Sequence, residues 1–156
     1  MSLSPSYPIV EVYSQVDFSE KNLKWLENSA REGIPLVLAH PGTEEPVLPK
    51  LTEVEVTLIS DETIAQVHGE FLDDPTPTDV ITFHHGEILI SVETAEREST
   101  QYGKTWEEEI LLYLVHGLLH LNGHTDLEEP ERETMHQIQE DILSRILSGD
   151  ARKLEN

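Results

Sequence analysis

The residues with the clearest chemical potential are two histidines, His116 and His120, which lie four positions apart. In an α-helix this spacing places both imidazoles on one face, about one turn apart. Two imidazoles arranged in this way can share one tetrahedral cation, with metal–nitrogen bonds of about 2.0–2.1 Å. The spacing therefore predicts a metal site on the helix that carries them.

A glycine and an aspartate downstream extend this pattern. The run reads H-x-x-x-H-x-x-G-x-x-D over 116–126, with Gly123 as its glycine. The spacing equals that of the metzincin signature, in which a third ligand follows a glycine turn. We therefore predict that Asp126 is the third ligand, and that His124 is the alternative. Without a metal, Asp126 would suit the cap of the next helix.

Catalytic groups are harder to assign from the sequence. The metzincin general base is a glutamate directly after the first histidine, but Gly117 occupies that position here. Glu109, two helical turns before His116, and His124 are the candidates for an acid or base. For Glu109 the alternative is a solvated helix surface. Other histidines are predicted at the surface or in a solvated turn, namely His68, His84, His85 and His136.

Composition limits the chemistry that is available to this chain. The 156 residues contain no cysteine, so disulfides, a cysteine nucleophile and a thiolate metal site are excluded. Ten Lys and Arg against 31 Asp and Glu give a net charge of −21 at pH 7. This charge disfavours a non-specific nucleic-acid coat and docking on anionic lipid. With no signal peptide or membrane span in the sequence, we expect a cytoplasmic protein.

The strongest helical pattern surrounds the two histidines. Residues 106–122 are apolar almost all round, and Thr105 with Glu108 forms a capping box before them. A helix of this kind is buried in a protein core. Further helices are predicted from the Asp17–Glu20 capping box to about Gly33, from Asp61 to about Phe71, over 93–102, and from about Pro130 to Gly149.

Short strand patterns lie between these helices. Strands are predicted over 7–13, 53–59, 80–83 and 87–92, with loops at 40–52 and 73–79. Because strands and helices mix without strict alternation, we expect an α+β fold in which a small mixed β-sheet packs with helices. The metal-bearing buried helix suggests a zincin- or metzincin-like arrangement. The length suits a single domain over 1–156.

These motifs resemble the YbeY family of bacterial metal-dependent endoribonucleases. The family pattern HGxLHLxG corresponds to residues 116–123, and the PTDVLSF block appears as PTDVITF at 77–83. The runs EILISVETAERE (87–98) and YGKTWEEEILLYLVHG (102–117) are also similar, so the resemblance covers about 53–147. The family's third ligand is usually histidine, whereas Asp126 occupies that position here. The family usually has a Tyr-Arg pair six residues before the PTDV block, and Phe71-Leu72 replaces this pair here.

The resemblance implies a Zn²⁺ held by His116, His120 and, at the third position, Asp126. It also implies cleavage of single-stranded RNA in 16S rRNA 3′-end maturation and ribosome quality control. The expected partners are rRNA and ribosomal particles or basic ribosomal proteins, with no membrane and no DNA. One alternative is a non-catalytic, zinc-stabilised ribosome-assembly factor, and another is a metalloprotease.

The segments that flank the predicted site carry no permanent positive charge. No Lys or Arg lies between Lys50 and Arg97 or between Lys104 and Arg132. A scissile phosphate would therefore have to be met by the metal, by histidines, or by backbone N–H groups at helix starts.

Overall fold

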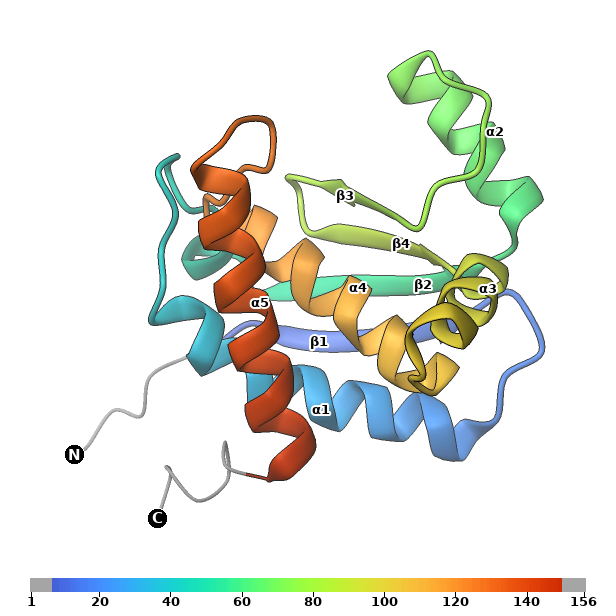
Figure 1. Cartoon of the computed structure of the whole chain (residues 1–156), viewed down its shortest axis with the longest axis horizontal. Helices are drawn as coiled ribbons and strands as arrows, with labels where there is room; N and C mark the ends of the chain where they lie inside the picture. The colour runs from blue at the N-terminus through green and yellow to red at the C-terminus, as the bar shows by residue number, and fades with distance from the viewer. Residues whose placement is uncertain (1–6, 150–156) are drawn as a thin grey trace.

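The computed structural model, which describes residues 7–149, contains one mixed β-sheet (Figure 1). Its order is β1-β2-β4-β3, in which the first three strands run parallel and β3 pairs antiparallel with β4. The strands are β1 (Ile9–Ser14), β2 (Glu53–Ile59), β3 (Val80–Phe83) and β4 (Glu87–Ser91). This sheet, packed with helices, confirms the expected α+β class.

The helices cover the two faces of the sheet unequally. They are α1 (Glu20–Leu38), α2 (Asp61–Leu72), α3 (Val92–Tyr102), α4 (Trp106–Leu121) and α5 (Glu131–Ser148), with a short 3-10 helix, η1, at Leu48–Lys50. Helices α1, α4 and α5 pack against one another, and α4 also contacts β3 and β4 (Figure 1). The main core lies on this face of the sheet.

Helix α4 is buried because it is apolar on nearly every side. Ile110, Leu114 and Leu118 have no exposed surface. The predicted capping box is present: the Glu108 N–H donates to the Thr105 hydroxyl at 3.2 Å, and the Thr105 N–H donates to the Glu108 carboxylate at 3.0 Å. These contacts satisfy backbone donors at the helix start. The core therefore fixes the orientation of the helix that carries both histidines.

The opposite face of the sheet has a smaller apolar cluster beneath α2. Ile59 of β2 packs there with Ile64 of α2 and Leu89 of β4. The alternation in 53–59 predicted a half-buried strand, but Thr57 and Ile59 are buried as well as Val54, Val56 and Leu58. Packing of Ile59 against Ile64 of α2 explains the burial of Ile59.

Two predicted boundaries of the first long helix are wrong. The helix does not begin with an Asp17 capping box, because the Ser19 hydroxyl accepts the capping bond. It also continues through Gly33 to Leu38. A Cβ at Gly33 would lie 3.0 Å from Ile146 Cδ1 of α5, so this glycine permits close helix packing and does not end the helix. Within residues 7–149, no helix is both long and apolar enough to cross a bilayer.

Candidate metal centre

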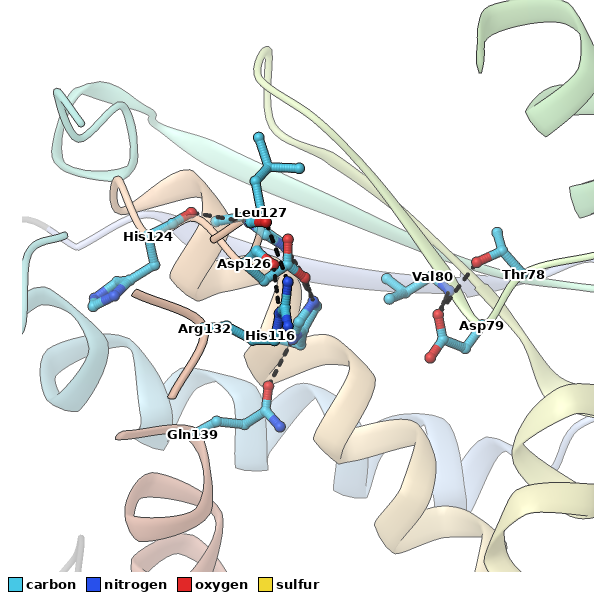
Figure 2. A network of polar contacts seen from close by, with 10 residues as sticks. Thr78, Asp79, Val80, His116, His124, Asp126, Leu127, Arg132 and Gln139 are labelled. Atoms are coloured by element: carbon cyan, nitrogen blue, oxygen red, sulfur yellow. Dashed lines mark hydrogen bonds and ion pairs between the residues drawn. The ribbon is translucent and has the colours of Figure 1, made fainter. Parts of the chain in front are cut away.

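Helix α4 and the loop after it bring three metal-binding side chains together. His116 Nε2 and His120 Nε2 are 3.0 Å apart, and Asp126 Oδ2 lies 3.5 and 3.6 Å from them, respectively. Figure 2 shows His116 facing Asp126, with Gln139 on the other side of the imidazole. All three side chains are partly exposed, so solutes can reach them. In residues 7–149 this metal trio is the one group of three His, Asp or Glu side chains close enough to hold an ion.

Neighbouring groups fix the protons of both imidazoles. His116 Nδ1 lies 2.7 Å from Gln139 Oε1, and His120 Nδ1 lies 3.0 Å from the backbone oxygen of His124. These oxygens can only accept hydrogen bonds, so each Nδ1 must donate. In a neutral imidazole each Nε2 then presents its lone pair to the centre of the metal trio, as metal ligation requires.

The donor set of the metal trio fits a divalent cation. Two nitrogen lone pairs and a carboxylate oxygen face one another, an arrangement that repels unless a positive charge lies between them. Ligands bonded at about 2.0–2.1 Å to a tetrahedral zinc are roughly 3.3 Å apart, close to the separations found here. Burial, and secondarily the nearby His116, lower the pKa of His120. This shift favours the neutral imidazole, which is the form that binds metal.

A backbone contact with a distant loop holds the turn that delivers Asp126. Gly123 has φ +94°, a conformation that favours glycine, and its carbonyl oxygen accepts a hydrogen bond from the Glu44 N–H at 3.0 Å. The Gly42 N–H donates to the Asn122 carbonyl oxygen at 3.0 Å. A Cβ at Gly42 or Gly123 would overlap backbone atoms of the other loop. Sequence reasoning assigned no function to this loop.

His124 contributes its backbone carbonyl, and its ring points elsewhere. Its side chain is 7% exposed, and its Nε2 lies 2.6 Å from the backbone oxygen of His40. Figure 2 shows this ring directed away from His116 and Asp126. The structure therefore places His124 beside His120 as a supporting residue and leaves its side chain outside the metal trio.

Glu109 is buried, so the alternative of a solvated helix surface is wrong for this residue. Its side chain is 4% exposed and lines a second cavity together with Tyr113 and Asp79. Burial raises the pKa of Glu109, and the adjacent Tyr113 hydroxyl partly opposes this increase. Glu109 is absent from the lining of the cleft at the metal trio. Glu109 therefore lies outside the cleft that holds the metal trio.

Glu109→Gln is expected to change the pH dependence of stability. The pKa of Glu109 is raised in the folded protein, so at a pH above the ordinary carboxyl pKa the folded protein binds more protons than the unfolded chain. The contribution of Glu109 to the free energy of unfolding therefore falls as pH rises through this range. Glutamine removes that loss. The free energy of unfolding, measured by urea titration from pH 4 to 7, should shift in favour of the variant as pH rises. A difference that stays constant across this range would contradict the assignment.

The remaining candidate histidines fall in different surroundings. His84 is exposed at the β3–β4 turn and lines the cleft at the metal trio, whereas His85 stacks on Phe83. His68 was predicted to be exposed, but it is half-buried and its Nδ1 lies 2.8 Å from the Thr76 carbonyl oxygen. His136 is exposed on α5, as predicted.

Gln139 is a functional candidate that sequence reasoning missed. It is buried on α5, 23 residues from the imidazole that it contacts. Gln139→Leu is expected to weaken zinc binding about 10–100-fold, because the His116 ring loses the partner that fixes its tautomer. A competition titration with a zinc chelator measures this effect. Gln137→Leu, on the exposed side of the same helix, is the control. Equal affinities for both variants would contradict the role of Gln139.

The fold and the site define a class: an α+β protein in which two histidines and one carboxylate that could hold a metal ion lie at an open cleft of about 500 Å³. The sequence model of the family described as "Endoribonuclease YbeY" matches residues 15–147. The chain therefore belongs to the YbeY family. The match begins upstream of residue 53, so it also includes α1 and the loop that braces Gly123.

Individual relatives agree with this membership. An "Endoribonuclease YbeY" of Lysinibacillus sphaericus is 30% identical over 137 residues, which cover 76% of this chain and 87% of the relative. One from Heliobacterium modesticaldum is 35% identical over 59% of this chain and 68% of its own length. The solution structure of TM1509 from Thermotoga maritima has a similar fold, with a TM-score of 0.60, 24% identity and 92% coverage of both chains.

Proposed function

We propose that this protein is a zinc-dependent endoribonuclease that cleaves single-stranded RNA in 16S rRNA 3′-end maturation and ribosome quality control. The observation that carries the proposal is the metal trio, which lies in an open cleft of a YbeY-family chain. The curated relatives are named endoribonucleases. Two oriented imidazoles and a carboxylate are ligands that zinc accepts in catalytic sites.

The chain's own residues prepare the site for phosphodiester chemistry. A bound zinc supplies Lewis-acid chemistry, which polarises a phosphoryl oxygen and lowers the pKa of a coordinated water. His116 and His120 would hold the zinc through Nε2, while Gln139 Oε1 and the His124 carbonyl oxygen accept hydrogen bonds from their Nδ1 atoms. Asp126 approaches from the loop and would partly neutralise the charge of the bound zinc. These contacts set the ligand geometry before substrate arrives.

The remaining parts of the proposal concern architecture and partners. The long helix with two histidines, followed by the Gly123 turn and a third ligand, supports a zincin-like arrangement within a single domain. A net charge of −21 favours basic ribosomal proteins as partners alongside rRNA in the particle. These partners are the basis on which we propose a cytoplasmic location.

RNA cleavage by metal-free and zinc-reloaded protein tests this function. The reloaded protein should cut an end-labelled single-stranded 16S 3′-precursor RNA, and the metal-free protein should not cut it. A 2′,3′-cyclic phosphate on the product would identify the neighbouring 2′-OH as the attacking group. Binding to ribosomal particles without turnover would overturn the enzyme proposal and favour the assembly-factor alternative.

A further inference from the structure

The cleft at the metal trio is poor in positive charge for a protein that binds a phosphodiester. Three carboxylates line it, from Glu44, Asp79 and Asp126, and no Lys or Arg of the described residues does so. The three carboxylates outnumber the two charges of a divalent ion. A phosphate oxygen that enters this cleft therefore needs a further donor from the chain.

The histidines around the cleft differ in whether they are free to provide that donor. His116 and His120 use Nδ1 for their oxygen partners and turn Nε2 toward the metal position. The His124 ring is buried against the His40 carbonyl oxygen. His84 also lines the cleft and is exposed, and its ring makes no hydrogen bond or ion pair with the residues that the structure describes. An imidazole has at least one N–H donor in either protonation state.

The turn that carries His84 is fixed relative to the sheet. The Gly86 N–H donates to the Phe83 carbonyl oxygen at 2.9 Å, and the Glu55 N–H donates to the Gly86 carbonyl oxygen at 2.8 Å. Gly86 has φ +106°, which permits this tight turn. His84 is therefore presented on a short, hydrogen-bonded turn between two paired strands.

Close packing of β3 on α4 brings this turn to the metal trio. A Cβ at Gly117 would lie 3.0 Å from Thr82 Oγ1 and 2.8 Å from Ile88 Cδ1. Because Gly117 has no side chain, α4 can pack closely against these two residues of β3 and β4. Gly117 directly follows His116, and Thr82 lies two residues before His84. The same contact therefore positions both the first metal ligand and the strand that leads into the turn.

We propose that His84 is a substrate-binding residue that donates a hydrogen bond to a backbone phosphate of single-stranded RNA in this cleft. The inference rests on the proposed function, because it takes RNA as the occupant. Its neighbour His85 provides a matched control, since its ring stacks on Phe83 at 5.6 Å and its Nε2 lies 3.1 Å from Glu87 Oε1. His85 does not line the cleft.

Zinc-loaded wild type, His84→Ala, His84→Gln and His85→Ala test the inference. Binding is measured by fluorescence anisotropy with a labelled 2′-O-methyl single-stranded RNA, shown by gel to stay intact. His84→Ala should bind about 10-fold more weakly, as expected for a lost hydrogen bond to a charged group. His84→Gln retains an N–H donor and should stay within about 3-fold of wild type. With cleavable RNA, His84→Ala should raise KM and leave kcat and zinc content nearly unchanged.

Specific outcomes overturn the inference. The inference is wrong if His84→Ala binds the RNA as tightly as wild type, or if His84→Ala and His84→Gln lose equal RNA affinity. It is also wrong if His85→Ala loses as much RNA affinity as His84→Ala, or if wild type does not bind the RNA. RNA cleavage with unchanged kinetics in His84→Ala would support the proposed function and reject the role of His84. RNA binding that depends on His84 but is followed by no cleavage of unmodified RNA would reject the proposed function and support the inference.

Discussion

His120→Ala is expected to reduce kcat/KM for single-stranded RNA cleavage by more than about 100-fold, because the metal trio loses one of its two nitrogen ligands. Removing only a residue that orients a ligand costs about 10–100-fold in metal affinity or activity, so removing the ligand itself should cost more. The measurement is kcat/KM with zinc supplied at one equivalent per chain.

The control for this substitution is His136→Ala, since His136 is an exposed histidine on α5 outside the metal trio. Circular dichroism should show that both variants retain the helices of the wild type. Near-normal cleavage by a folded His120→Ala protein would mean that catalysis does not depend on the predicted ligand.

Gly123→Ala is expected to lower the free energy of unfolding by more than about 3 kcal/mol. The native φ of +94° disfavours any residue with a Cβ, and that Cβ would overlap the Glu44 carbonyl oxygen. Both obstacles involve backbone atoms, which cannot move aside as a flexible side chain can. Because the same turn delivers Asp126, zinc affinity should fall as well. Urea unfolding and zinc titration measure the two effects.

Gly103→Ala separates the cost of the backbone conformation from the cost of the contact. Gly103 has φ +67°, but nothing lies within 4 Å of a Cβ built there. Its substitution should cost only the left-handed backbone penalty of about 1–2 kcal/mol. Equal destabilisation by Gly103→Ala and Gly123→Ala would show that packing between the two loops contributes nothing.

Local sequence patterns predicted most of the helices and strands because their signals are contained in short segments. The predictions for 53–59 and 80–83 coincide with β2 and β3. The apolar run and capping box at 105–122 also matched α4 closely. The spacing of the histidines and Asp126 predicted that three side chains would meet, because a helix and one turn determine their separation. That they bind a metal stays a prediction.

The features that sequence reasoning missed depend on contacts between distant segments. Gly33 lies in α1 where α5 approaches, so a residue that usually ends helices continues one. Gln139 reaches His116 from another helix, and no local motif marks it. The burial of Glu109 likewise follows from neighbours that lie outside its own helix.

The stabilising loop at Gly42 and Glu44 shows the same limitation. Its prolines and glycine predicted an irregular segment, which the structure shows apart from η1. Its role comes from two backbone hydrogen bonds to residues about 80 positions away, Asn122 and Gly123. A pattern of side chains along the chain carries little information about such backbone pairing.

Zinc content measured by elemental mass spectrometry most directly tests the central claim, that His116, His120 and Asp126 form the metal centre. Wild type, His120→Ala, Asp126→Ala and His124→Ala are compared after refolding with zinc and removal of excess. We predict one zinc per chain in wild type and in His124→Ala, because that variant keeps the backbone carbonyl that contacts His120. We predict that His120→Ala and Asp126→Ala lose stoichiometric zinc. Loss of zinc in His124→Ala with retention in Asp126→Ala, or no zinc in folded wild type, would contradict the account.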